Sequence, residues 1–404
     1  CPDDRNAAVL STETGTPLLL LANPHSLRLV QNDDDPADNR AAITQYRLPA
    51  NGLYLLGLST VKGEARNRYT LALSAVQGGA VEAPPSAEVV RGMERALAYQ
   101  QWNEPERAVA EYTRVIEAVP TYAPAYVGRG NAYLSQSQYS QAEQDFTQAL
   151  ELDPNSPTAL YGRANAAAGQ GYYWTAMQDL SRVLLIDPDD TLAYFQRGKL
   201  HSYVAEYEQA AADFAEVIKR QPDDADAYYN RALAYDALGR TSDALDDYTS
   251  AITIDPANAS ALINRGILYD AAGEDQLAID DYTAAAKLQP ENALPFFNRG
   301  LVYSRQGKYT DAINDFNQAI AINPQYARAY NERGNAYGDS GNPTDAIADY
   351  RRAIEIDPAF SAPHIGLGNL YLDADRPEDA VEEYTAAIEL APDDAIGYYN
   401  RALA

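Results

Sequence analysis

Residues 225–258 read ADAYYNRALAYDALGRTSDALDDYTSAITIDPAN, and this stretch predicts two antiparallel helices joined by a short turn. Apolar residues recur at helical spacing from Tyr228 to Tyr235, and Gly239 then interrupts the pattern. A second helical pattern begins near Ser242 and stops at Pro256, because proline cannot continue a helix. The stretch therefore predicts one helical hairpin.

The hairpin is one copy of a repeat. Prolines recur nine times at a constant interval of 34 residues, at Pro120, Pro154, Pro188, Pro222, Pro256, Pro290, Pro324, Pro358 and Pro392. A fixed period of this length predicts stacked supersecondary units. An alanine stands twelve positions before each proline. Eight positions before each proline stands a large apolar residue: Tyr112, Phe146, Leu180, Phe214, Tyr248, Tyr282, Phe316, Tyr350 or Tyr384.

Two more sets of equivalent positions, which we call columns, lie in the first helix of each copy. One holds tyrosines, interrupted by Ala167 and His201: Tyr99, Tyr133, Tyr235, Tyr269, Tyr303, Tyr337 and Tyr371. Three positions earlier stand glycines in six copies: Gly130, Gly198, Gly266, Gly300, Gly334 and Gly368. We expect the small residues to let the two helices approach closely, and the aromatic residues to fill the space between them.

These columns resemble the tetratricopeptide repeat in its common bacterial form. The resemblance rests on Tyr228-Tyr229-Asn230-Arg231-Ala232, Asp247-Tyr248 and Ile254-Asp255-Pro256, and on their counterparts in the other copies. It covers Val89 to Ala404, as nine full units and a first half-helix from Ala395 to Ala404. It implies an all-α superhelical solenoid of stacked helical hairpins over residues 87–404.

The composition excludes several functions. The 404 residues include 31 Lys and Arg against 58 Asp and Glu, which gives a net charge of −27. Such a chain repels phosphate and anionic lipid, so nucleic acid and membrane surfaces are disfavoured as partners. The longest apolar run, Pro17–Ala22, falls far short of the roughly 20 residues of a membrane-spanning helix. The single cysteine, Cys1, allows no disulfide within the chain and no thiolate metal site.

Charged residues form a paired pattern along the repeat. An arginine occupies the first helix of eight copies, as Arg95, Arg129, Arg163, Arg197, Arg231, Arg265, Arg299 and Arg333, and Leu367 replaces it in the ninth. Sixteen positions later stands an acid: Glu111, Asp145, Asp179, Asp213, Asp247, Asp281, Asp315, Asp349 or Glu383. An antiparallel hairpin would place the two opposite each other. The pattern is either a structural ion pair, which we favour, or a ladder of charged ligand sites.

The period disappears before Val89, where short apolar runs alternate with turn-forming residues and predict a small antiparallel sandwich. Residues Asn32–Asp35, Tyr46–Leu55 and Tyr69–Leu73 resemble the bacterial pre-peptidase C-terminal domain, a β-sandwich appended to many secreted proteins. The resemblance covers roughly Ala7 to Ser74. We therefore expect a β-sandwich over residues 1–76, a linker over 77–86 and the solenoid over 87–404.

This second resemblance implies export, and so an extracellular or cell-envelope location. No signal peptide is present. A cysteine at the first position is typical of a mature bacterial lipoprotein, which would make Cys1 a lipid anchor. The alternative is that Cys1 is a truncation point. Ala404 favours truncation, since it stops within a helical pattern without the polar cap that a solenoid needs.

No catalytic constellation stands out, and we expect no enzyme and no cofactor. His201 and His364 occupy aromatic columns and are predicted to be core substitutions, and no nucleophile, phosphate loop or metal motif accompanies them. Asp33, Asp34 and Asp35 could hold Ca²⁺, which prefers several hard oxygens, although a solvated acidic turn is the favoured interpretation.

The first helices of a solenoid of this kind line its concave wall, where such arrays bind partners. Two columns face this wall in the predicted arrangement, and they carry an apolar and aromatic stripe: Tyr161, Phe195, Tyr229, Leu233, Ile263, Ile267, Phe297 and Leu301. Lys199 is the only basic residue in these two columns, so a carboxylate ligand is disfavoured. We expect an amphipathic helix, an apolar peptide or a second copy as partner. The same side chains could instead pack against neighbouring helices.

The sequence thus predicts a non-catalytic interaction scaffold outside the cytoplasm that binds a protein or peptide. Two other classes stay open. The chain could be a structural subunit of an extracellular assembly, formed by self-association of solenoids. It could also be an accessory module of a secreted hydrolase whose catalytic part lies elsewhere.

Overall fold

The computed structural model describes residues 9–11, 40–42 and 86–404, which form two short strands and 19 helices. The elements are β1 (Val9–Ser11), β2 (Arg40–Ala42), α1 (Ala87–Gln101), α2 (Pro105–Ala118), α3 (Ala123–Leu134), α4 (Tyr139–Leu152), α5 (Pro157–Gly169), α6 (Tyr173–Ile186), α7 (Thr191–Tyr203), α8 (Tyr207–Arg220), α9 (Ala225–Ala237), α10 (Thr241–Ile254), α11 (Ala259–Ala271), α12 (Asp275–Leu288), α13 (Ala293–Arg305), α14 (Tyr309–Ile322), α15 (Ala327–Asp339), α16 (Pro343–Ile356), α17 (Ala362–Asp373), α18 (Pro377–Leu390) and α19 (Ala395–Leu403). The predicted repeat of helical hairpins is confirmed.

The turn inside each hairpin depends on one residue with left-handed backbone conformation. Gly239, between α9 and α10, has a φ of +70°, which a glycine adopts without steric penalty. The amide of the next residue, Arg240, donates to the carbonyl of Tyr235 at 2.8 Å and closes the end of α9. Glycine holds this position in five hairpins, and Asn103, Ser137, Ala205 and Asp375 hold it in the other four, also at positive φ.

Large buried apolar side chains, which are aromatic in eight of the nine hairpins, fill the space between the two helices of each hairpin, as the columns predicted. The side chains eight positions before the prolines are at most 4% exposed, from Tyr112 to Tyr384. The residues opposite these side chains must be small, because the two helices lie close together. A Cβ on Gly300, for example, would lie 2.7 Å from the ring of Phe316. Apolar burial of this kind, repeated in every hairpin, supplies the main stabilising term.

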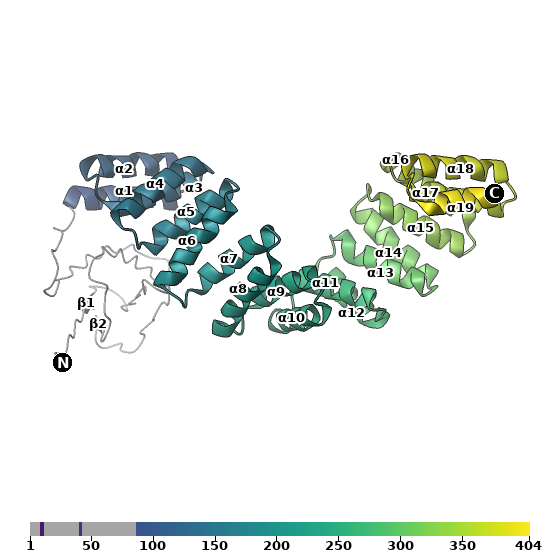
Figure 1. Cartoon of the computed structure of the whole chain (residues 1–404), viewed down its shortest axis with the longest axis horizontal. Coiled ribbons are helices and arrows are strands. Elements are labelled where there is room, and N and C mark those ends of the chain that lie inside the picture. The colour runs from purple at the N-terminus through teal and green to yellow at the C-terminus, as the bar shows by residue number, and fades with distance from the viewer. Residues whose placement is uncertain (1–8, 12–39, 43–85) are drawn as a thin grey trace. The chain divides into compact units, whose positions relative to one another are not determined.

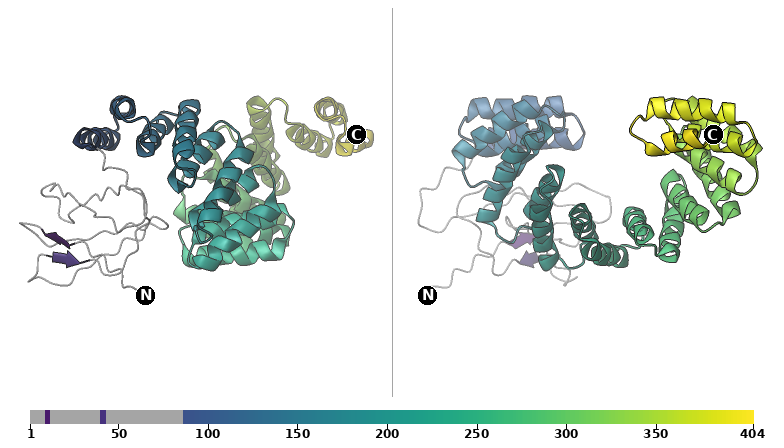
Figure 2. Two further views of the ribbon diagram at one scale, coloured as in Figure 1. Left: turned by 60° about the vertical axis from the view of Figure 1, so that its left-hand side comes forward. Right: turned by 45° about the vertical axis from the view of Figure 1, so that its right-hand side comes forward.

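The chain divides into two compact units, Cys1–Ala193 and Tyr194–Ala404, with the boundary inside α7. Within each unit the hairpins stack side by side, and helices that are neighbours in sequence contact one another, as α3 and α4 or α13 and α14 do (Figure 1). Neighbouring odd-numbered helices, such as α1 and α3 or α13 and α15, also contact one another. The further views show the same side-by-side stacking of the helices within each unit (Figure 2). We call the surface of the odd-numbered helices the inner face.

The amino-terminal region is described only in part. Strands β1 and β2 pair antiparallel, with Val9 opposite Ala42. The other strands of the predicted β-sandwich, nearly all of the 77–86 linker, Cys1 and the acidic turn Asp33–Asp35 lie outside the described residues. Within the described residues, no helix is long and apolar enough to cross a membrane, and no group of His, Cys, Asp and Glu could hold a metal ion.

The buried tyrosines should make the fold sensitive to alkali. Burial raises the pKa of Tyr112 to about 12, and it also raises the pKa of Tyr248. A folded-state pKa above the ordinary value near 10 gives a stabilisation that is present below about pH 10 and is lost as pH rises toward 12. We therefore predict that circular dichroism falls cooperatively above about pH 10.5, together with a second rise in tyrosinate absorbance.

Replacing single tyrosines tests this directly. The Tyr248 hydroxyl is buried near the Asn264 amide without a well-formed hydrogen bond, whereas Tyr112 Oη donates to Gln100 Oε1 at 2.7 Å. Tyr248→Phe should leave neutral stability unchanged or raise it, and should move the alkaline midpoint upward. The matched variant Tyr112→Phe should cost about 1 kcal/mol at neutral pH. An equal loss of stability at neutral pH in both variants would contradict the conclusion that the Tyr112 hydroxyl is hydrogen-bonded and the Tyr248 hydroxyl is not.

Candidate partner-binding surface

The arginine column forms ion pairs inside the hairpins, as the spacing predicted. Arg231 on α9 donates from Nε and Nη2 to both oxygens of Asp247 on α10, at 2.7 and 2.8 Å. These hydrogen bonds raise the pKa of Arg231. Asp247 is 5% exposed, and the acids of the other seven pairs are also buried: Glu111, Asp145, Asp179, Asp213, Asp281, Asp315 and Asp349. The pair thus fixes two helices at mid-length.

Several arginines make a third bond that reaches the preceding hairpin. Arg265 Nη1 on α11 donates to Thr249 Oγ1 on α10 at 3.0 Å, and Arg299 on α13 reaches Thr283 on α12 at 2.8 Å. The same bond joins Arg129 to Thr113 in the first unit. One guanidinium therefore links two helices of its own hairpin to the hairpin before it. This use of its donors supports a structural role over a ligand site.

The ninth hairpin pairs its acid with a histidine instead of an arginine. Its acid, Glu383 on α18, is not left opposite an apolar residue, because His364 Nδ1 on α17 lies 2.7 Å from Glu383 Oε2. Leu367, at the arginine position, is 2% exposed and belongs to the core. His364 was predicted to be a core substitution, yet it supplies the polar partner that Leu367 removes. The sequence could have revealed this role, because His364 stands three residues before Leu367 and therefore on the same side of the helix.

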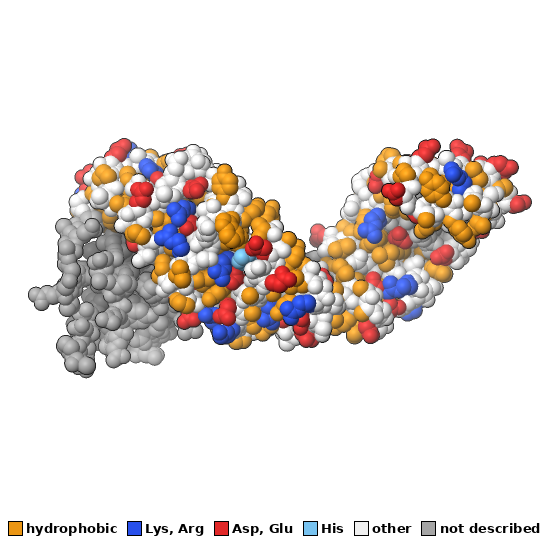
Figure 3. All heavy atoms as spheres, viewed as in Figure 1, with side chains coloured by type: hydrophobic (Ala, Val, Ile, Leu, Met, Phe, Trp, Pro, Cys, Tyr) orange, Lys and Arg blue, Asp and Glu red, His pale blue; other side chains and the backbone are white. Residues whose placement is uncertain are grey.

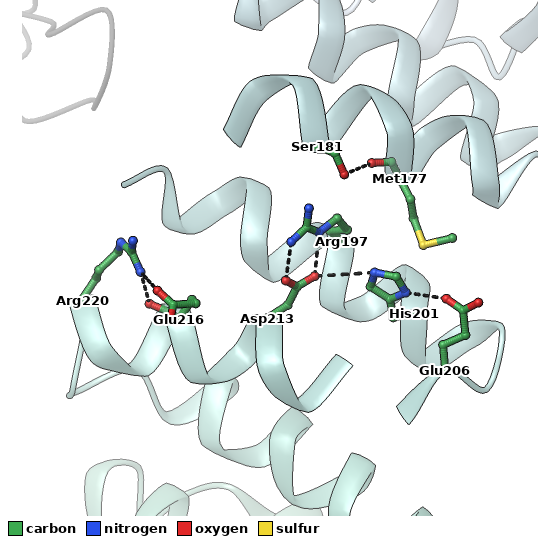
Figure 4. Close-up of polar contacts among 8 residues, drawn as sticks. All are labelled: Met177, Ser181, Arg197, His201, Glu206, Asp213, Glu216 and Arg220. Carbon is green, nitrogen blue, oxygen red and sulfur yellow. Dashed lines mark hydrogen bonds and ion pairs between the residues drawn. The ribbon is translucent and has the colours of Figure 1, made fainter. Parts of the chain in front are cut away.

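His201 lies among acidic and basic side chains of α7 and α8 (Figure 4). Its Nδ1 is 2.7 Å from Glu206 Oε2, and its Nε2 is 3.8 Å from Asp213 Oδ2. Asp213 also accepts two hydrogen bonds from Arg197, at 2.8 and 2.6 Å. The imidazole is 14% exposed, so His201 is largely buried at the tyrosine position, and the short turn after α7 brings Glu206 onto it. The contacts form a polar network that joins α7 to α8.

The first predicted column of partner-binding residues lies largely inside the fold. Ile263 and Phe297 are 5% and 2% exposed, so they are not available to a partner in this conformation. Phe195 and Tyr229 are half-buried, with their rings 5.6 and 6.0 Å from those of Phe214 and Tyr248.

Tyr161, the column's member in the first unit, is half-buried as well. Its hydroxyl donates to Asp190 Oδ1 at 2.7 Å. This column therefore packs against neighbouring helices for the most part, because its side chains lean toward the rings of the second helices. Packing was the alternative that the sequence left open.

The second predicted column reaches the surface. Leu233 on α9 and Ile267 on α11 are 36% and 42% exposed, and Leu301 on α13 is half-buried. These three residues recur at one position of successive hairpins in the second unit, and we call them the inner stripe. Asp236 follows Leu233 by one helical turn and is exposed. The space-filling view shows hydrophobic side chains reaching the surface between charged ones (Figure 3).

A second apolar surface was not predicted. Trp174 and Leu185 on α6 are 63% and 83% exposed. A hollow of about 400 Å³ lies beside Leu185, lined also by Asn155, Arg182 and Ile186. An alignment of the repeats could have revealed this surface, because the other hairpins carry polar or small residues at these two positions.

Sequence models described as "Tetratricopeptide repeat" match residues 123–156, 195–259, 235–293, 297–359 and 339–404, which together cover more than half of the chain. This chain is a tetratricopeptide repeat protein. The matched models describe a repeat and indicate no catalytic family. Tetratricopeptide arrays are suited to protein–protein interaction, because their stacked helices create extended binding surfaces.

Several crystal structures are similar to this tetratricopeptide repeat protein. MamA is 26% identical, over 42% of this chain and 92% of its own, with a TM-score of 0.40. YrrB, described as a TPR protein with an unusual peptide-binding site, is 23% identical over 47% and 97%, with a TM-score of 0.41. A tetratricopeptide repeat protein from Parabacteroides merdae is 18% identical over 61% and 98%, with a TM-score of 0.47. No curated protein matches the sequence.

A double-mutant cycle tests the ion pair. Arg231→Leu should destabilise the protein by about 3 kcal/mol, since it leaves the buried Asp247 carboxylate unpaired. Adding Asp247→Leu should recover much of that loss, because two apolar side chains leave no buried charge. Chemical denaturation of the four proteins measures the coupling. Losses that simply add would show that the two residues do not act as a pair.

Proposed function

We propose that this protein is a non-catalytic scaffold that binds an amphipathic protein segment along the inner stripe of its second unit. The exposure of Leu233 and Ile267 on adjacent odd-numbered helices is the observation that carries the proposal. Two exposed aliphatic side chains and the half-buried Leu301 recur at one position of three successive hairpins, so they form an apolar row rather than isolated exposures. A protein segment lying across α9, α11 and α13 would cover that row.

The charge around the inner stripe favours a basic flank on the partner. Asp236 lies one turn from Leu233 and is exposed, whereas Asp270, one turn from Ile267, is already paired with Arg305. The chain as a whole carries a net charge of −27, which attracts cationic segments and repels acidic ones. An amphipathic helix with an apolar face and lysine or arginine beside it combines both requirements. Burying one leucine at such a contact contributes about 1.5 to 3 kcal/mol.

We further propose that the protein acts outside the cytoplasm, in the cell envelope or beyond it. Support comes from the resemblance of residues 7–74 to the β-sandwich of secreted proteins. Fractionation of the source cells tests the location. Protein confined to the cytosol would contradict the proposal.

A second candidate function is that of a structural subunit that associates with copies of itself. The exposed Trp174 and Leu185 of α6 favour it, because neither residue is needed by the repeat.

Binding to a synthetic amphipathic helix of about five turns tests the scaffold. The peptide carries leucines on one face, lysines on both flanks and a fluorescent label. We predict that Leu233→Asn with Ile267→Asn weakens binding at least tenfold, or about 1.4 kcal/mol, by anisotropy. Asparagine is native at this position in four other hairpins, as Asn131, Asn165, Asn335 and Asn369, so the fold should be retained.

The control is Leu277→Gln on α12, a leucine that is 45% exposed on an even-numbered helix. It should leave the affinity unchanged, and a peptide with glutamates in place of the lysines should not bind. Equal binding by the double variant and the unmodified protein would move the partner site away from the inner stripe.

A further inference from the structure

The even-numbered helices differ in the charge that they expose. The exposed residues of α6 are Trp174, Thr175, Gln178 and Leu185, and none of them is charged. Each of the other eight even-numbered helices in the described part of the chain exposes at least one aspartate or glutamate. In a chain with a net charge of −27, α6 therefore presents an outer surface without carboxylates. We call these four residues the α6 face.

The repeat does not account for Trp174 and Leu185. Glu106 and Glu208 stand at the position of Trp174 in other hairpins, and Glu117 and Lys219 stand at the position of Leu185. Those hairpins fold with charged residues there, so neither apolar side chain is required for folding. Their exposure, 63% and 83%, leaves large apolar areas in water, which marks an interaction surface.

The two side chains lie on one side of α6. Eleven residues separate them, which is close to three full turns, so they are about 16 Å apart along the helix axis. Trp174 projects at the amino-terminal end. At the other end, beside Leu185, lies the hollow of about 400 Å³ that Asn155, Arg182 and Ile186 complete. One helix thus carries a large aromatic side chain at one end and a hollow at the other.

Building on the second candidate function, self-association, we propose that the α6 face binds the α6 face of a second copy of this chain, in antiparallel orientation about a two-fold axis. In this arrangement Trp174 of each copy enters the hollow beside Leu185 of the other. The same contact is then made twice, as a closed two-fold interface requires. Gln178 lies near the middle of the face, where an amide can both donate to and accept from its symmetry mate.

Arg182 gives the hollow its affinity for an indole ring. Its Nη2 donates to the carbonyl of Pro154 at 2.8 Å, which holds the guanidinium at the rim. A guanidinium fixed in this way can stack on the face of a tryptophan, and arginine on tryptophan is among the most favourable cation–π pairs. The hollow therefore offers the indole ring of Trp174 both an apolar surface and a guanidinium on which to stack.

The overall charge selects this face for self-association. Two copies that each carry −27 repel one another, and a contact through any other even-numbered helix would bring carboxylates together. Added salt screens this repulsion but leaves apolar contact and stacking largely intact. Dimerisation should therefore become stronger as the NaCl concentration rises, which is the opposite of an interface held by ion pairs.

Sedimentation equilibrium of the full chain tests the proposal. The unmodified protein should be a dimer at micromolar concentration, and Trp174→Glu should raise the dissociation constant at least thirtyfold with unchanged circular dichroism. The control is Trp102→Gln, which removes the only other tryptophan, 54% exposed, and introduces a residue native to that position as Gln136. The control should dimerise like the unmodified protein.

Restoration by a second change tests the antiparallel geometry. Trp174→Glu combined with Leu185→Lys should dimerise again, because residue 174 of one copy then faces residue 185 of the other with opposite charge. Failure of this double variant to dimerise would overturn the antiparallel pairing. The proposal is also overturned if the unmodified protein stays monomeric at all concentrations and salt levels. A monomer whose tryptophan fluorescence shifts to the blue with phosphatidylcholine vesicles would assign the α6 face to a lipid surface instead.

Discussion

The buried pair between an arginine and an acid sixteen residues later is the contact on which the rest of the solenoid depends. In the second unit, Arg265 holds Asp281 with two hydrogen bonds and grips Thr249 of the hairpin before it with a third. A carboxylate buried between two helices is costly unless it is paired, so the pair fixes both the crossing of the helices and the alignment of the hairpin. Close packing of rings against glycines then follows at that alignment.

This arrangement determines what the surface can do. The repeated arginines of the second unit are paired with buried acids, as in Arg231, Arg265 and Arg299, and the inner face shows Leu233 and Ile267 beside them. The even-numbered helices expose acids, except at α6. Two apolar surfaces therefore stand out against an acidic background. One lies in each unit, and each fits a different kind of partner.

Sequence patterns predicted the solenoid in detail, because nearly every hairpin repeats the same features: the break at Gly239, the large apolar residue at Tyr248 and the pair of Arg231 with Asp247. They predicted the binding surface only in part. Ile263 and Phe297 belong to the same column as half-buried Tyr229, and a periodic pattern does not reveal how far each side chain leans inward. His364 and the α6 face were missed because both are departures from the repeat, and alignment on shared columns directs attention away from them.

Hydrogen exchange measured by mass spectrometry on Arg265→Leu tests the central role of the ion pair most directly. Loss of the guanidinium leaves Asp281 buried and unpaired, and it removes the bond to Thr249. Exchange should accelerate in α11 and α12 and, to a smaller extent, in α10, while α1 to α4 stay as protected as in the unmodified protein. Unchanged exchange in α11 and α12, or an equal acceleration along the whole solenoid, would contradict the account.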